Sequence, residues 1–134
     1  MKETVLMYRI EEKAKQAIVT ILKQLDVEIR EIGEDETPQQ IGYLLNLPGF
    51  KKSEEESQRK CEESFLFFAF FTDEQLDIVL EIFRRASIPY IPYKAMLTND
   101  NVVYTFEELY TNVEHEYESI TNQSKKSNWQ IKEN

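Results

Sequence analysis

At 134 residues the chain has the length of one domain, and its 41% hydrophobic and 31% charged residues are typical of a folded protein. A formal net charge of −9 disfavours binding to nucleic acid and to anionic membranes. Cys61 is the only cysteine, which excludes an internal disulfide. The N-terminus has no signal-peptide pattern and the longest apolar run, residues 65–71, is too short to span a membrane. We therefore expect a cytoplasmic protein without a membrane segment.

The first third of the chain predicts a strand, a helix and a strand. Residues 4–10 are apolar on both alternating faces, which is typical of a strand buried on both sides. Apolar residues recur at helical spacing from Ala14 to Leu25, with lysines and glutamines opposite them, and predict an amphipathic helix. Residues 27–32 alternate like a half-exposed strand, and Gly33 ends them.

Residues 33–63 interrupt this pattern. Thr37 and Pro38 begin a capping-box sequence that predicts a short helix, with Thr37 as its cap. That helix ends before Pro48. Residues 51–63 contain nine charged residues of both signs and predict a solvated loop or the frayed end of a helix.

The pattern then resumes with a second strand, helix and strand. Residues 65–71 (FLFFAFF) predict a strand by their aromatic content, and the capping box TDEQ at residues 72–75 begins a helix. Residues 88–97 resemble a strand, but Pro89 and Pro92 confine it to a sheet edge because proline donates no backbone hydrogen bond.

A third capping box, TFEE at residues 105–108, begins a last helix whose apolar stripe runs to Ile120. Residues 121–134 are polar and predict a disordered tail. The prediction is therefore one α+β domain, residues 1–120: a ferredoxin-like βαββαβ sandwich with a short inserted helix and an extra C-terminal helix. In that fold strands one and three are central and strands two and four are edges, as the apolar patterns require.

The two central strands also predict a second covering layer. Both crossover helices of a βαββαβ unit pack on one sheet face, yet residues 4–10 and 65–71 are apolar on both sides. A bare aromatic sheet face is unusual for a soluble monomer. We expect the other face to be covered by residues 105–120 or by a second copy of the chain.

The stretch from Phe65 to Glu118 resembles a known family, the domain of unknown function 3783, whose members are bacterial proteins with no established activity. The resemblance lies in the apolar strand followed by TDEQL at residues 72–76, in YKAMLTNDN at residues 93–101, and in YTF at residues 104–106. Tyr104 stands where such proteins often have tryptophan. The resemblance implies one compact domain of bacterial type and no particular activity.

One group of residues is a candidate ligand site. Lys94, Thr98 and Asn101 lie between the last strand and the last helix, and Thr105 begins that helix, where free backbone N–H groups attract anions. This pattern predicts a site for a small anionic ligand, to which we add His115, the only histidine. In the structural alternative, Thr98 and Asn101 satisfy the backbone of their own loop and Lys94 is solvated.

Other chemistry is less well supported by the sequence. His115 and its neighbouring glutamates match no metal motif, so we expect no metal and no cofactor. Cys61 lies among glutamates, which raise a thiol pKa where catalysis needs it lowered. RNA-recognition modules stack bases on the aromatic residues of a strand, and residues 65–71 contain several phenylalanines. The Lys/Arg-Gly pair that begins the RNA-recognition motif is missing here, however, and packing in the core accounts for the phenylalanines.

Because no group of residues in the sequence fits a known catalytic arrangement, we favour a non-catalytic regulatory or protein-interaction module that forms a homodimer. The alternative is a binder of a small anionic ligand, or a weak enzyme acting on one, at the segment from Lys94 to Thr105.

Overall fold

The computed structural model describes residues 1–126 and, in the last helix, the side chains as far as residue 120. Four strands form one mixed sheet in the order β2-β1-β3-β4. β1 (Thr4–Tyr8) is parallel to β2 (Glu28–Ile32) and antiparallel to β3 (Phe65–Ala69), and β3 is parallel to β4 (Tyr93–Met96). Within the described residues no helix is long and apolar enough to cross a membrane.

Two βαβ units make up the sheet. Helix α1 (Glu12–Gln24) connects β1 to β2, and α3 (Asp73–Arg85) connects β3 to β4. From its first strand to the turn after its helix, the second unit repeats the backbone of the first at a spacing of 61 residues: β1 and β3 begin at positions 4 and 65, and the helices begin at 12 and 73. The residues with positive φ obey the same spacing, at 9 and 70 and again at 26 and 87.

The predicted ferredoxin-like strand order is not the one observed. β1 and β3 are central and β2 and β4 are edges, as predicted, but each edge strand pairs with the strand of its own βαβ unit, and the two central strands are antiparallel. In a ferredoxin-like sheet the two units interleave and the central strands are parallel. The apolar pattern identifies the strands that are buried on both faces, but it specifies neither their neighbours nor their direction. The observed fold is therefore mixed α and β with a different topology.

Two of the three predicted capping boxes are present. Thr72 accepts from the N–H of Gln75 and the Gln75 side chain accepts from the N–H of Thr72, at 3.0 and 2.8 Å. Thr105 and Glu108 make the same pair of bonds. The predicted cap at Thr37 is wrong: the short helix α2 (Ile41–Leu44) begins after Gln40, without a side-chain cap, and Thr37 ends the 3₁₀ turn η1 (Glu34–Glu36).

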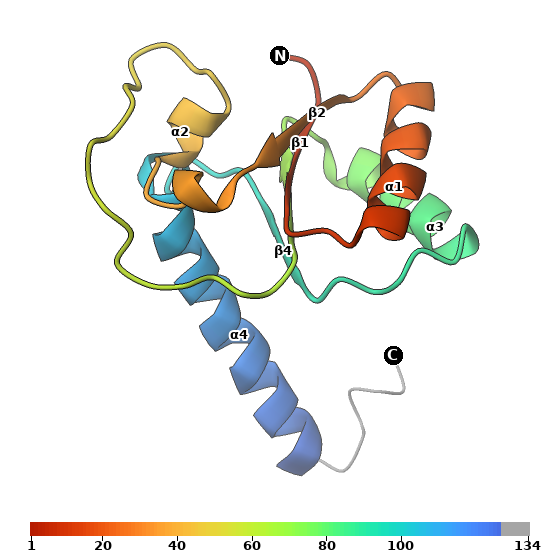
Figure 1. Cartoon of the computed structure of the whole chain (residues 1–134). Helices are drawn as coiled ribbons and strands as arrows, with labels where there is room; N and C mark the ends of the chain where they lie inside the picture. Colours follow the sequence, from red (N-terminus) through yellow and green to blue (C-terminus); the bar gives the residue numbers. More distant parts are fainter. Residues whose placement is uncertain (127–134) are drawn as a thin grey trace.

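The sheet lies between two layers of helices (Figure 1). α1 and α3 cover one face and pack on Val5, Met7, Leu66 and Phe68. The alternate residues of the same strands pack on the other face against α2 and α4 (Phe106–Lys126). Of the two coverings predicted for this face, a second copy or residues 105–120, the structure shows the helix, which packs there through Phe106 to Val113 together with α2.

The insertion between β2 and β3 is an ordered loop fixed at several points. The side chain of Gln39 exchanges two hydrogen bonds with the backbone of Ser53, at 2.7 and 3.0 Å. The ring of Phe50 lies against Gly42, so closely that a Cβ at position 42 would overlap it. Residues 51–63 contain no helix, which favours the loop of the two predicted alternatives.

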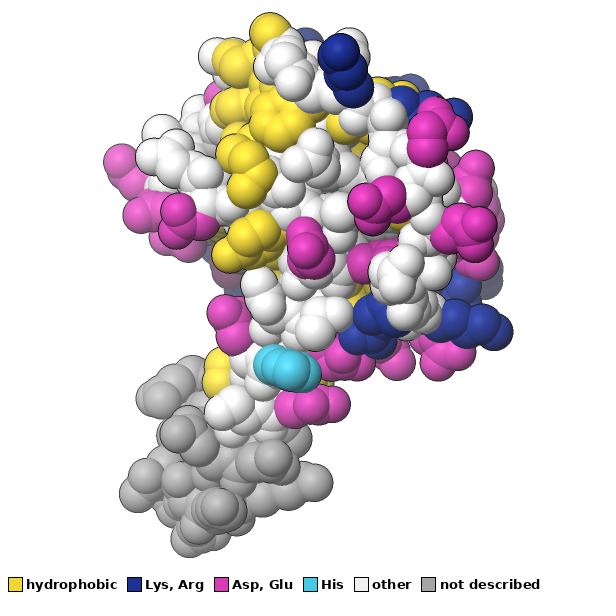
Figure 2. Space-filling view, turned by 90° about the vertical axis from the view of Figure 1, so that its left-hand side faces the viewer, with side chains coloured by type: hydrophobic (Ala, Val, Ile, Leu, Met, Phe, Trp, Pro, Cys, Tyr) yellow, Lys and Arg dark blue, Asp and Glu magenta, His cyan; other side chains and the backbone are white. Residues whose placement is uncertain are grey.

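The insertion also carries an apolar surface. α2 packs beside η2, a 3₁₀ turn of residues Asn101–Val103, and hydrophobic side chains gather on this face of the molecule (Figure 2). We define the α2–η2 patch as the partly or fully exposed apolar residues of these two segments and of the loop after α2: Tyr43, Leu45, Leu47, Pro48, Phe50 and Val103. Val103 is 53% exposed.

The predicted domain boundary at residue 120 falls inside α4, which continues to Lys126. The rest of the predicted tail, residues 127–134, lies outside the described residues.

Candidate functional site

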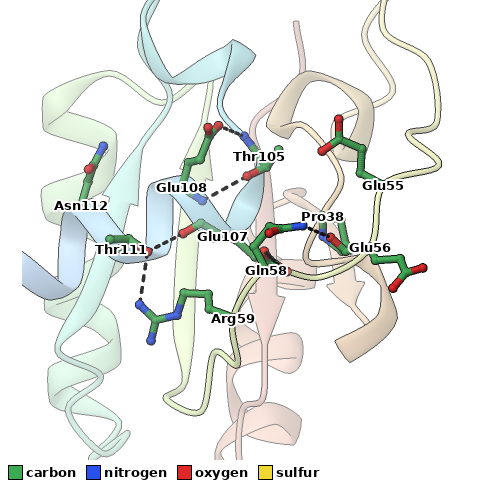
Figure 3. Close-up of a pocket in the computed structure, with 10 residues that line it drawn as sticks. All are labelled: Pro38, Glu55, Glu56, Gln58, Arg59, Thr105, Glu107, Glu108, Thr111 and Asn112. Atoms are coloured by element: carbon green, nitrogen blue, oxygen red, sulfur yellow. Dashed lines mark hydrogen bonds between the residues drawn. The ribbon is translucent and has the colours of Figure 1, made fainter.

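A pocket of about 410 Å³ lies between the first turns of α4 and the loop that precedes β3 (Figure 3). Four glutamates line it, together with the basic residue Arg59: Glu55, Glu56, Glu107 and Glu108. The acidic excess raises the free energy of an anion at this end of α4, which opposes the attraction of the helix N-terminus.

Glu107 is the buried centre of this region, with 6% of its surface exposed. One carboxylate oxygen accepts from the hydroxyl of Thr37 at 2.6 Å, and the other accepts from the backbone N–H of Gln58 at 2.9 Å. The backbone N–H of Glu107 itself donates to the carbonyl of Thr37 at 3.1 Å. Both carboxylate oxygens are thus occupied, and the side chain joins the insertion to α4.

Arg59 makes the second link between the loop and α4. Its guanidinium donates to the carboxylate of Glu114 at 2.7 Å and to the hydroxyl of Thr111 at 3.2 Å, and it lies 4.7 Å from the centre of the Tyr110 ring. Arg59 lowers the pKa of Glu114 mainly through their hydrogen bond. We call these contacts of Arg59 with α4 the clamp, because they hold the charged loop against the helix.

Cys61 follows Arg59 by two residues in the same loop, and its side chain is buried. Burial raises the pKa of its thiol to about 11, and the negative charges of Glu107 and Glu114 act in the same direction, while Arg59 opposes them. The backbone carbonyl of Cys61 accepts from the hydroxyl of Tyr8 at 2.5 Å. A thiol held in its protonated form is a poor nucleophile, so this geometry does not favour cysteine catalysis.

The structure brings Thr98 and Asn101 together. The N–H of Thr98 donates to the side-chain oxygen of Asn101 at 2.9 Å, and the N–H of Asn101 donates to the hydroxyl of Thr98 at 3.0 Å. The Asn101 amide also donates to the carbonyl of Met96 at 2.8 Å. These polar groups satisfy the backbone of their own loop, as the structural alternative predicted.

Lys94 does not lie with them. It lines a second pocket, of about 280 Å³, together with Leu80, Phe83 and Arg84 of α3. Its ammonium group donates to the carbonyl of Ile91 at 2.6 Å. Burial lowers the pKa of Lys94. The side chain is thus neither fully solvated nor directed towards the start of α4.

The remaining predicted residues are also separate from Lys94. The hydroxyl of Thr105 caps α4, and the backbone N–H of Thr105 donates to the side-chain carboxylate of Glu108. His115 is exposed on α4 and lines neither of the two pockets. Among the described residues, no three histidine, cysteine or acidic side chains are grouped so that they could hold a metal ion.

Sequence reasoning did not find Glu107 or Arg59. Glu107 occupies an ordinary position in an acidic first helical turn, and Arg59 lies in a run of mixed charge that suggested solvent exposure. Their partners are 49 to 70 residues away in sequence, and no local pattern marks such pairs.

Comparison with known proteins identifies one family. Residues 64–120 match the model of the family described as Domain of unknown function (DUF3783). The resemblance stated from the sequence is thereby confirmed for this segment, which comprises β3, α3, β4 and the covering part of α4. No curated protein and no solved structure matches the chain.

Proposed function

We propose that the protein is a non-catalytic regulatory or protein-interaction module that associates with a second copy of itself. The observation that carries this proposal is the α2–η2 patch, where hydrophobic side chains gather on one face of the molecule (Figure 2) and Val103 is 53% exposed. Contiguous exposed apolar surface is characteristic of protein-interaction sites. The polar groups near α4 support the same conclusion, because they are engaged in holding the loop rather than free for chemistry.

The charges beside the patch favour a second copy as the partner. Lys51 and Lys52 follow directly on Phe50, and exposed Glu54, Glu55 and Glu56 come next. In a two-fold contact, a residue i of one copy that meets residue j of the other is matched by the reverse contact. A two-fold axis between the lysines and the glutamates would set the lysines of each copy opposite the glutamates of the other. Such pairs offset the general repulsion between two chains of net charge −9.

The test is native mass spectrometry of the wild type and of Val103→Glu at about micromolar concentration. We expect a dimer for the wild type and a monomer for V103E. Ile78→Glu is the matched control, since Ile78 is 58% exposed on α3, away from the patch. A wild-type monomer at all concentrations would overturn the proposal.

A further variant distinguishes this patch from the exposed end of α4. Ile120 is 52% exposed there. If Ile120→Glu yields monomers while V103E remains dimeric, the contact uses α4 and the α2–η2 patch is not the interface. Circular dichroism on each variant separates loss of association from loss of folding.

Binding of a small anion remains the second candidate function. The specific observation in its favour is Lys94, which makes no ion pair with any described carboxylate although it is partly buried. Loss of ligand affinity in Lys94→Ala is the expected result.

We also propose a bacterial, cytoplasmic setting for the module, which rests on the family resemblance and on the lack of a disulfide.

A further inference from the structure

The pocket beside Lys94 arises from a difference between the two βαβ units. In the first unit β2 begins four residues after the end of α1, from Gln24 to Glu28. In the second unit β4 begins eight residues after the end of α3, from Arg85 to Tyr93. The longer connection, residues 86–92, forms one wall of a pocket whose other walls are α3 and the strands β3 and β4.

This connection is built to keep its shape. Pro89 and Pro92 fix two of its backbone φ angles, and each proline restricts the residue before it to extended conformations. Ser87 has a φ of 60°, the same turn that Asp26 makes in the first unit. A preformed wall lowers the entropy cost of binding, because little of the loop has to be ordered when a ligand enters.

The described lining of the pocket is apolar apart from two cations and the hydroxyl of Tyr90. Arg84 and Lys94 supply positive charge, and the apolar side chains are Leu66, Leu80, Phe83, Ile88, Pro89 and Ile91. Arg84 is already paired with Glu81 through two hydrogen bonds, at 2.9 and 2.6 Å. Among the described residues no acidic side chain lines the pocket, although the sequence contains 25 acidic residues.

Lys94 is the cation available to a ligand. Its position opposite Leu66 in the β3–β4 pair directs it to the α3 side of the sheet. One of its three N–H groups donates to Ile91, and the ammonium lies 4.3 Å from the centre of the Tyr90 ring. Burial lowers the pKa of this lysine, and no carboxylate of the described residues compensates for the lost hydration.

We propose that this pocket binds a small apolar carboxylate, whose charge pairs with Lys94 while its hydrocarbon part lies against α3 and residues 88–91. The volume of about 280 Å³ sets the size of the ligand. A cavity of about 150 Å³ accommodates benzene, so this pocket has room for a single-ring acid or for a chain of about eight carbons. Strongly polar acids are disfavoured, since the other described lining side chains are apolar except for Arg84, which is paired with Glu81, and the hydroxyl of Tyr90.

Octanoate is a suitable probe, and octanamide is its neutral counterpart of the same length. We expect calorimetry on the full chain to give at least about tenfold tighter binding of octanoate, the effect of one charge-assisted hydrogen bond. Lys94→Met should remove this preference and leave octanamide binding unchanged. Lys94→Arg keeps the positive charge and should retain octanoate binding within a few-fold.

The control variant is Lys13→Met, which removes one positive charge from the exposed face of α1. It should not alter binding. Methyl NMR should locate octanoate through shifts at Leu66, Leu80 and Ile91. The proposal is overturned if octanoate does not bind, if octanamide binds equally well, or if K94M and K13M have the same effect.

Discussion

Thr37 donates its hydroxyl hydrogen to the carboxylate of Glu107 at 2.6 Å, although the two residues are 70 positions apart in the chain. Because Gln58 donates to the other oxygen, one buried carboxylate connects η1, the charged loop and α4. This connection holds the insertion over the second face of the sheet, and its removal has measurable consequences.

Glu107→Ala should lower the free energy of unfolding by about 2–4 kcal/mol, because it leaves the Thr37 hydroxyl and the Gln58 N–H without their acceptor. Urea denaturation is the measurement. Glu116→Ala, at an exposed position of the same helix, should change stability by less than about 0.5 kcal/mol. Equal effects of the two variants would show that the buried carboxylate contributes no more than a surface charge.

Arg59→Met should loosen the loop without unfolding the domain. The variant loses the bonds to Glu114 and Thr111 and the contact with the Tyr110 ring, which together stabilise the loop by about 1–2 kcal/mol. Amide hydrogen exchange should accelerate in residues 57–62 and remain slow in β1 and β3. Acceleration throughout the sheet would instead mean that the clamp is part of the global folding unit.

Thr72→Ala should cost about 1 kcal/mol, because it removes the cap of α3 and one bond of the capping box. Thr20→Ala is the matched control. Thr20 is exposed inside α1, and alanine has the higher helix propensity, so this change should be neutral or slightly stabilising in thermal unfolding. A neutral Thr72→Ala would mean that the N-terminal turn of α3 is held by other contacts.

Cys61 should make the protein less stable in alkali. Its pKa is about 11 in the folded protein and 9.0 for an ordinary thiol, so between pH 9 and pH 11 the unfolded chain loses this proton first. The contribution of the Cys61 thiol to the free energy of unfolding is fully present below pH 9. It decreases as the pH rises, by at most about 1.4 kcal/mol per pH unit. Urea titrations at about pH 8 and 10.5 should show a smaller loss for Cys61→Ala than for the wild type. Identical losses would contradict the assignment.

The sequence indicated those features that depend on neighbouring residues. The capping boxes at Thr72 and Thr105 and the amphipathic pattern of α1 need only a few adjacent positions, and all three are present in the structure. Thr37 shows the limit of this reasoning. It has the same local capping signature as Thr72, but α2 begins only after Gln40, and the Thr37 hydroxyl donates to Glu107 of α4.

Strand order and the candidate site depended on information that no local pattern contains. The apolar pattern distinguished central from edge strands, yet two sheet orders satisfy it equally. Lys94 and Thr105 are close in sequence, but alternation along β4 directs Lys94 to the α3 side of the sheet, and Thr105 lies at the start of α4 on the other side. Counting alternate residues in β4 would have revealed this separation only if the strand limits had been known.

The repeat of 61 residues gives the sheet an internal symmetry. Leu6 and Phe67 are equivalent positions of the two units, and they lie directly opposite each other in the antiparallel β1–β3 pair. An approximate two-fold axis therefore passes between them, perpendicular to the strands. The segment that matches the family model, residues 64–120, contains only the second of the two βαβ units. Without β1, the inner edge of its β3 would have unpaired backbone groups along its whole length. The first 32 residues thus supply, within one polypeptide, the strand partner that a symmetric pair of such segments would have to supply for each other.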